Sequence, residues 1–184
     1  MERCAWAESA VEYRAYHDDE WGVPLHGDDA LFERLALEAF QSGLSWITIL
    51  RKRENFRVAF NGFHLATVAA YGDDDVRRLL ADAGIVRNRA KVEATISNAR
   101  VALAQPEGLD QLLWSFADPA AGPQRPATIA DIPATSPASA AMAKELKGRG
   151  FRFIGPTTAY ALMQATGMVD DHVATCWRAA PSGR

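Results

Sequence analysis

The sequence predicts an all-α protein, and three observations support this fold class. Apolar residues recur at helical spacing in most segments, for example at Leu31, Phe32, Leu35, Ala36 and Ala39. Several of these segments open on a capping residue or a proline and close on a glycine, as helices commonly do. Strand signals are nearly absent, and residues 151–154 are too few to nucleate a sheet.

The first half of the chain predicts three helices. The first spans 28–41 and the second spans 44–60. The third begins at Asp73, whose carboxylate suits an N-cap, and ends near Gly84, because glycine commonly follows the last turn of a helix.

The second half predicts further helices that are separated by one long loop. These helices span 88–105, 109–116, 137–147 and 156–167, and Ser136 and Pro137 resemble the start of the third. Residues 118–137 hold five of the nine prolines and predict an extended loop. A last short helix is expected from Asp170 or Asp171 through Cys176.

Size and composition limit the classes of protein to consider. With 184 residues and 48% apolar content, the chain can bury a core without disulfides, as one domain or two small lobes. It shows neither an apolar run that would span a membrane nor the apolar start of a signal peptide. Two cysteines at opposite ends indicate free thiols or a metal site. We therefore expect a cytoplasmic protein.

Charge gives a mixed indication for nucleic-acid binding. The net charge of −3 argues mildly against it. Basic residues nevertheless gather in three groups, whereas acidic residues gather at 73–75. These groups are 51–53, then Arg87 with Arg89 and Lys91, then Lys144 with Lys147, Arg149 and Arg152. A one-sided positive field can survive a negative total, although solvated helix faces are the commoner explanation of any one group taken alone.

A candidate metal site joins the two ends of the chain. Four residues form the set: Cys4, His17, His172 and Cys176. His172 and Cys176 are four residues apart in a predicted helix, so their side chains would leave one face. Two cysteines and two histidines suit a tetrahedral structural zinc. The alternative is two buried thiols and two ordinary histidines.

Glu38 is a candidate pocket carboxylate. It follows Leu31 by seven residues, which places it about 20° from that residue around the helix axis, on the apolar stripe. A buried carboxylate needs a partner or takes a raised pKa, as pocket acids and base-reading acceptors do. The alternative is a carboxylate at the edge of the stripe, paired with an arginine.

Aromatic residues crowd the N-terminal part of the chain. The group comprises Trp6, Tyr13, Tyr16, Trp21 and Trp46. Flat rings of this kind can stack a base that has been flipped out of a duplex. Ordinary core packing is the competing explanation.

Residues 147–159 predict two helices joined by a tight, glycine-bounded hairpin. Gly155 would allow close backbone approach, and the new helix offers free N–H groups to a phosphate. Thr157 and Thr158 can add hydroxyl contacts, which would position DNA without reading its sequence. A plain helix–helix connection is the alternative.

Long and unusual sequence strings resemble the bacterial 3-methyladenine DNA glycosylase I family of the helix-hairpin-helix superfamily. The strings cover nearly the whole chain and occupy residues 1–4, 16–24, 41–48, 51–55, 149–151 and 171–173. The resemblance implies one glycosylase domain over 1–184, with two helical lobes and the hairpin at about 147–159. It implies a monomer that acts on double-stranded DNA containing alkylated adenine, with no obligate protein partner and no membrane association.

The resemblance also implies roles for individual residues. Glu38 would hydrogen-bond the methylated base between rings from Tyr16 and Trp46, and Trp6, Tyr13 and Trp21 would complete the pocket. Leu44, beside Gly43, matches the residue that wedges into the duplex where the base has left. Cys4, His17, His172 and Cys176 match the ligands of one structural zinc ion.

Asp170 departs from the closest family pattern, which commonly has asparagine at this position. It is either a residual catalytic carboxylate of the superfamily or a helix N-cap. The expected reaction is hydrolysis of the N-glycosidic bond of 3-methyladenine, which leaves an abasic site. A non-catalytic helix-hairpin-helix DNA-binding protein and a metal-dependent hydrolase are the alternatives, and the latter needs an open metal position.

Overall fold

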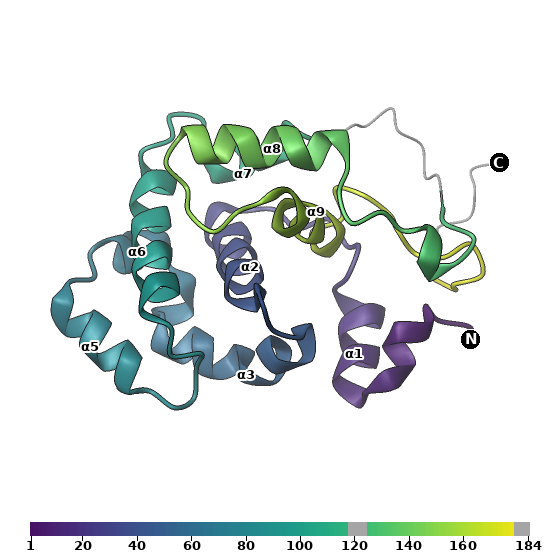
Figure 1. Ribbon diagram of the computed structural model, residues 1–184, viewed down its shortest axis with the longest axis horizontal. Coiled ribbons are helices and arrows are strands. Elements are labelled where there is room, and N and C mark those ends of the chain that lie inside the picture. Colours follow the sequence, from purple (N-terminus) through teal and green to yellow (C-terminus); the bar gives the residue numbers. More distant parts are fainter. Residues whose placement is uncertain (118–124, 179–184) are drawn as a thin grey trace.

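Helices form all of the regular secondary structure in the computed structural model, which describes residues 1–117 and 125–178 (Figure 1). Within those residues the α-helices are α1 (Val11–Asp19), α2 (Asp28–Gln41), α3 (Trp46–Ala59), α4 (Leu65–Ala69), α5 (Asp73–Ala81), α6 (Arg89–Leu103), α7 (Leu109–Trp114), α8 (Pro137–Gly148) and α9 (Pro156–Ala165). Short 3-10 helices are η1 (Ala5–Ser9), η2 (Asn61–Phe63) and η3 (Ile129–Asp131). None of the helices in these ranges is both long and apolar enough to cross a bilayer.

The helix starts follow the capping chemistry of the sequence. The side chain of Asn88 accepts a hydrogen bond from the Lys91 N–H at the start of α6. Ser136 accepts from the Ser139 N–H at the start of α8, with Pro137 in the first turn. Asp73 lies inside α5 rather than before it, because Gly72 occupies the N-cap position.

A hydrophobic core surrounds α2, which is the central helix. Nine of its side chains, from Leu31 to Phe40 with one exception, are buried, so this helix is covered on nearly every side. Five phenylalanines that are fully buried form part of this core: Phe32, Phe40, Phe56, Phe60 and Phe63. Each such ring stabilises the fold by roughly 2–3 kcal/mol relative to an exposed one.

A second apolar cluster joins the N-terminal and C-terminal segments. Its buried members are Cys4, Tyr16, Trp21, Ala165, Val173 and Cys176. The Trp177 N–H donates to the Glu2 carbonyl at 2.9 Å, so the backbones of the two segments also touch. Figure 1 shows α1 beside the yellow C-terminal segment.

Several predicted elements differ from the structure. The helix expected from Asp170 or Asp171 through Cys176 is wrong, because this segment consists of turns. Its backbone instead bonds to distant segments, as when the Ala174 N–H donates to the Pro126 carbonyl at 3.0 Å. The expected loop at 118–137 contains η3, and its residues 118–124 lie outside the described residues. Helices α1 and α4 were not predicted.

Candidate functional site

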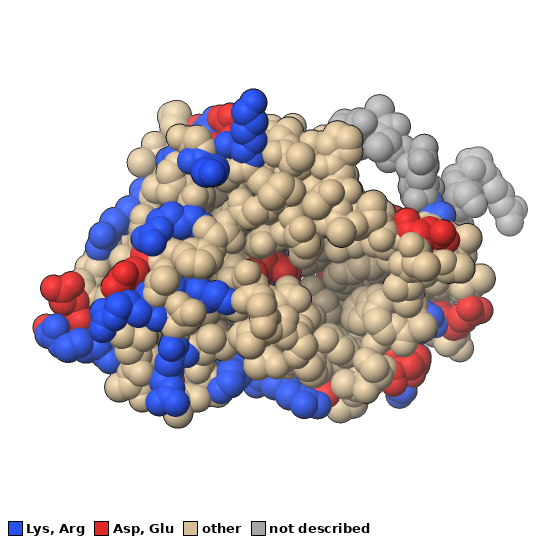
Figure 2. All heavy atoms as spheres, viewed as in Figure 1, with Lys and Arg blue, Asp and Glu red and all other residues tan. Residues whose placement is uncertain are grey.

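A cavity of about 320 Å³ lies beside α2 and collects the aromatic residues singled out in the sequence. Its lining comprises Trp6, Tyr13, Tyr16, Trp21, Glu38, Gln41, Trp46, Ile132, Ala161 and Gln164. All five predicted rings are therefore brought together with the predicted carboxylate. Figure 2 shows a hollow near the centre of one face, with acidic atoms visible inside it.

Glu38 is the carboxylate of this cavity. Its side chain is 4% exposed, and burial raises its pKa to about 7 against the opposing positive charge of Arg34. Burial disfavours the charged form, and no hydrogen bond from the described residues contributes to the shift. The carboxylate oxygens therefore keep their accepting capacity for a ligand in the cavity.

Arg34 lies one helical turn before Glu38, and its positive charge lowers the pKa of Glu38. Its guanidinium donates to the Tyr16 hydroxyl at 3.1 Å and to the Glu20 carboxylate at 3.1 Å. Glu20 also accepts from Arg53 at 2.5 and 2.7 Å. The alternative for Glu38 was a carboxylate at the edge of the stripe that pairs with an arginine. Arg34 does act on Glu38 through its charge, but its hydrogen bonds go to Tyr16 and Glu20.

The rings of the cavity form adjacent walls. Tyr16 and Trp46 lie with their centroids 5.5 Å apart and their planes at 47°. Trp6 meets Tyr13 and Trp21 edge to face at 5.6 and 5.2 Å. Tyr13 is fixed further because its hydroxyl accepts the Ile47 N–H at 2.9 Å. In this geometry Tyr16 and Trp46 are neighbouring surfaces rather than a parallel pair.

Four lining residues were missed in the sequence. Gln41 could have been found, because it lies three residues after Glu38 on the same helix face. Ala161 and Gln164 come from α9, and Ile132 comes from the segment after η3, so no local pattern connects them to Glu38. The Gln164 amide is held by Asp171, whose carboxylate accepts from it at 2.8 Å.

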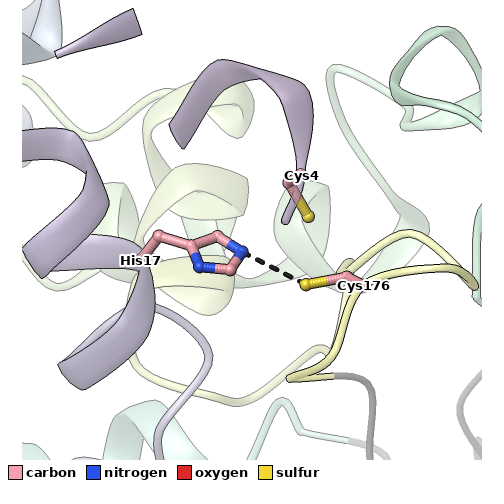
Figure 3. Close-up of side chains that lie close together, drawn as sticks. All are labelled: Cys4, His17 and Cys176. Carbon is pink, nitrogen blue, oxygen red and sulfur yellow. Dashed lines mark hydrogen bonds between the residues drawn. The ribbon is translucent and has the colours of Figure 1, made fainter. Parts of the chain in front are cut away.

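Three of the four predicted metal ligands lie together. The sulfurs of Cys4 and Cys176 and a ring nitrogen of His17 are all within 4.8 Å of one another and are buried (Figure 3). His17 Nε2 is 3.3 Å from Cys176 Sγ. These three residues are close enough to bind a metal ion.

His172 lies next to this group. Its ring centroid is 5.1 Å from that of His17, and its Nε2 is buried without a hydrogen-bond partner among the described residues. The backbone at Gly22 permits this approach, since φ there is +77° and a Cβ would stand 2.6 Å from His172 Cε1. A buried imidazole nitrogen without a partner, on a ring next to His17, calls for an explanation such as a ligand that it would bind.

Carboxylates hold both histidine rings from behind. His17 Nδ1 is 2.8 Å from Asp18, and His172 Nδ1 is 2.8 Å from Asp170. This pairing leaves Nε2 of each ring free for another partner, as second-sphere carboxylates do at metal sites, and Nε2 of His17 faces Cys176. Asp170 also bonds to Arg125 at 2.8 Å and does not line the cavity. It is therefore neither a cavity carboxylate nor a helix cap, since residues 171–178 contain no helix.

The segment between α8 and α9 is a tight connection. Gly150 has φ of +100°, and Gly155 is the N-cap residue of α9. Both the N–H and the carbonyl of Arg152 are bonded to the side chain of Asn98, at 2.8 and 3.0 Å. Thr157 is exposed and Thr158 is half-buried in the first turn of α9.

Gly43 and Leu44 lie in the turn between α2 and α3. Gly43 has φ of +81°, and a Cβ there would meet nothing within 4 Å. Leu44 is 42% exposed, which is unusual for a leucine in this molecule. The turn thus presents an apolar tip next to the cavity residues Gln41 and Trp46.

The residues of the three basic groups differ in their ion pairing and in their exposure. Arg51, Arg53 and Arg149 form ion pairs with carboxylates. Lys91 is buried, whereas Arg87 and Arg152 are exposed. Figure 2 shows Lys and Arg side chains gathered on the half of the face formed by α5, α6 and the end of α8. The basic side chains of α5 and α6 stand among acidic ones, since Arg77, Arg78 and Arg89 pair with Asp74, Asp75 and Glu93.

Comparisons with known proteins all find methyladenine glycosylases. The family model described as methyladenine glycosylase matches residues 6–179. The chain is 46% identical to DNA-3-methyladenine glycosylase 1 of Escherichia coli (strain K12), over 96% of each protein. A crystal structure of 3-methyladenine DNA glycosylase I superposes with a TM-score of 0.90 at 47% identity, covering 96% of this chain and 99% of the other.

A second solved structure bears on the cavity. It is a variant of 3-methyladenine DNA glycosylase I in complex with 3-methyladenine, at 34% identity and a TM-score of 0.89. The match covers 96% of this chain and 96% of that chain.

Proposed function

This chain belongs to the methyladenine glycosylase family, and from that premise we propose that it excises 3-methyladenine from alkylated DNA. The reaction is hydrolysis of the N-glycosidic bond in base-excision repair, and it leaves an abasic site. The observation that carries the proposal is Glu38, a buried carboxylate with unused accepting capacity inside a cavity walled by five aromatic rings. Binding of DNA alone would need no such cavity.

The substrate accounts for the modest catalytic equipment. Methylation at N3 makes adenine a cationic substituent and therefore a good leaving group, so no strong general acid is required. The extruded base enters the cavity, where Glu38 accepts hydrogen bonds from it. The ring faces of Tyr16 and Trp46 attract a cationic base, by about 0.5–2 kcal/mol per good contact. Water then attacks the sugar carbon from which the base departs.

We propose a monofunctional enzyme. An enzyme that also cleaves the strand uses an amine to form a Schiff base with the sugar. No lysine lines the cavity in the described part of the chain. The expected product is therefore an intact strand with an abasic site.

The DNA duplex is proposed to rest on the helix-hairpin-helix formed by α8, residues 149–155 and α9. The free N–H groups at the start of α9, with Gly155, Thr157 and Thr158, suit a phosphate. Ala161 lines the cavity only about 8 Å of helix rise beyond Pro156, so a phosphate there is close to the extruded base. Leu44, next to Gly43, is proposed to fill the space that the base leaves.

A structural zinc ion is proposed at Cys4, His17, His172 and Cys176. The grouped ligand atoms, the orphaned Nε2 of His172 and the two carboxylate-held rings support this assignment. Zinc bound there would tether the two ends of the chain without activating a water, because four protein ligands leave no position open. This argues against the metal-dependent hydrolase. We further propose that the protein acts as a cytoplasmic monomer.

The test is incubation of the purified protein with DNA that carries radiolabelled methyl groups, followed by identification of the released bases. Selective release of 3-methyladenine, with 7-methylguanine retained, supports the proposal and a narrow cavity. No release from folded protein overturns it in favour of a non-catalytic DNA-binding relative.

A further inference from the structure

The turn between α2 and α3 connects three cavity residues to one exposed apolar tip. Glu38 and Gln41 lie near the end of α2, and Trp46 is the first residue of α3. Only residues 42–45 separate the two helices, and Leu44 is exposed at 42% among them. The position of this turn therefore sets the place of Leu44 relative to the cavity.

Lys91 fastens this turn from α6. Its Nζ donates to the carbonyl of Phe40 at 2.9 Å and to that of Ser42 at 2.5 Å. Carbonyls in the last turn of a helix lack intrahelical donors, and a cation there also interacts favourably with the helix dipole. Lys91 thus provides a C-terminal cap for α2 from a residue about fifty positions away in the sequence.

Burial of the Lys91 ammonium group costs folding free energy, and this cost indicates that Lys91 has a specific role. Lys91 is only 8% exposed, and burial lowers the pKa of its ammonium group. A buried lysine is retained only when its donors are used. Lys91 does not line the cavity, so its effect on a bound base has to pass through the turn.

The rest of the turn is supported from the cavity side. The Leu44 N–H donates to the Gln41 carbonyl at 2.6 Å, and the Ile47 N–H donates to the Tyr13 hydroxyl. Gly43 lies between these two hydrogen bonds. Its φ of +81° is one that glycine adopts readily, and a Cβ there would meet nothing within 4 Å. Removal of Lys91 would leave the beginning of the turn without its long-range attachment.

We propose that Lys91 is a positioning residue for base extrusion. By holding the carbonyls of Phe40 and Ser42, it keeps Leu44 where an apolar side chain can enter the duplex as the base leaves. This inference rests on the proposed glycosylase function, and it assigns Lys91 to the step that opens the duplex rather than to recognition of the base.

The central experiment compares Lys91→Met with wild type on two substrates. Single-turnover excision of 3-methyladenine is measured in duplex DNA and in single-stranded DNA, where no base has to be displaced. Misplacement of the turn should slow the duplex reaction by about tenfold to a hundredfold and leave the single-stranded reaction nearly unchanged. Affinity for free 3-methyladenine, followed by quenching of tryptophan fluorescence, should also stay unchanged. Equal losses on both substrates, or no loss, overturn the proposal.

Lys52→Met is the matched control. Lys52 likewise donates to two backbone carbonyls, those of Ala83 and Gly84 at 3.0 and 3.1 Å, but these belong to the loop before α6. It should excise from both substrates as wild type does. A duplex-specific loss in Lys52→Met would show that the loss of any lysine that holds two backbone carbonyls produces the effect. That result would overturn the assignment of Lys91.

Lys91→Arg keeps the proposal testable if the methionine variant does not fold. The guanidinium retains cationic donors but places them differently. The duplex rate of Lys91→Arg should therefore lie between the rates of the methionine variant and wild type. If only the arginine variant folds, its duplex rate should be below that of wild type. Equal loss on both substrates overturns the proposal in this variant as well. Wild-type protein in the same series reports the proposed function separately, because release by wild type without a Lys91 effect refutes only the positioning role.

Salt dependence separates positioning from direct phosphate binding. A lysine that contacts a phosphate contributes about 0.9 to the slope of log affinity against log salt concentration. Because Nζ of Lys91 is engaged with carbonyls, Lys91→Met should leave this slope unchanged. A slope reduced by that amount would identify Lys91 as a phosphate ligand instead.

Discussion

Burial of Glu38 lowers the stability of the folded protein in the pH range where its carboxylate is ionised. Its pKa of about 7 in the folded protein lies above the ordinary value of 4.5. At 1.36 kcal/mol per pKa unit, ionising this buried carboxylate costs roughly 3 kcal/mol of folding free energy above pH 7. This cost is the price expected of the binding role that we propose for Glu38.

The Glu38→Gln variant should lose excision activity and gain stability at alkaline pH. Because the folded pKa is raised, wild-type stability is greatest below the unfolded pKa of 4.5 and falls as pH rises toward 7. Glutamine does not titrate, so the melting temperature of the variant should exceed that of wild type at pH 8 and by less at pH 5. Thermal melts at both pH values check this. An equal difference at both would exclude the charge as the cause.

Arg34→Met should shift the acid limb of the pH profile of kcat/KM to higher pH. Arg34 is the cation that lowers the pKa of Glu38, and its other neighbours are the Tyr16 hydroxyl and Glu20, which keeps Arg53 as a partner. Excision should therefore fall more at pH 6 than at pH 8. A loss of the same size at every pH would instead indicate a packing defect.

Among the elements, the connection between α8 and α9 depends on one side chain. Asn98 of α6 is 2% exposed and bonds both backbone groups of Arg152. Without Asn98 the N–H and the carbonyl of Arg152, which take part in partly buried hydrogen bonds, would lose this partner, so the connection would rearrange.

Asn98→Ala should weaken binding to undamaged duplex DNA and spare binding of free 3-methyladenine. The hairpin is proposed to contact phosphates, and none of its residues 149–155 lines the cavity. Fluorescence anisotropy with a labelled duplex measures the first, and tryptophan quenching measures the second. Asn55→Ala, which removes a long, exposed 3.4 Å contact to Gly84, is the control. Unchanged duplex affinity in Asn98→Ala would remove the hairpin from the DNA contact.

Elements with strong local signals were predicted well. Helix α2 has the predicted bounds, α6 starts one residue after the predicted start, and α8 starts at its predicted cap, because apolar spacing and capping residues act locally. Helix α1 was missed because only Tyr16 and His17 are buried in its nine residues, which leaves too short an apolar pattern.

The failures share a different cause. The segment after Asp170 is shaped by bonds to Pro126, Glu2 and Cys4, which no local pattern reveals. Glu38 and the aromatic group were found in the sequence because helical spacing and composition mark them. The contribution of Ile132 to the cavity depends on chain segments that meet only in three dimensions.

At the scale of the molecule, the two ends of the chain support one wall of the cavity. Tyr16 and Trp21 line the cavity and also belong to the apolar cluster with Cys4 and Cys176. Loosening of the ends should therefore affect the cavity as well as the fold.

Removal of the proposed zinc should destabilise the protein. Cys176→Ser, or a strong chelator on wild type, should lower Tm by at least about 5 °C, because metal binding couples directly to folding. Elemental analysis should give one zinc ion per wild-type chain and less in the variant. The chelator should not lower Tm of Cys176→Ser further. Loss of zinc from wild type with an unchanged melting curve would refute the structural role.

Because Cys4 lies beside Cys176, the contact between the two ends of the chain forms only when synthesis is nearly complete. A ribosome adds about 5–20 residues per second, so roughly ten to thirty seconds pass between the two cysteines. During most of this time Trp6, Tyr13 and Tyr16 have been made, while Ala161 and Gln164, which line the same cavity, have not. The cavity is thus among the last parts of the nascent chain to close, and a chain interrupted before α9 carries its aromatic wall uncovered.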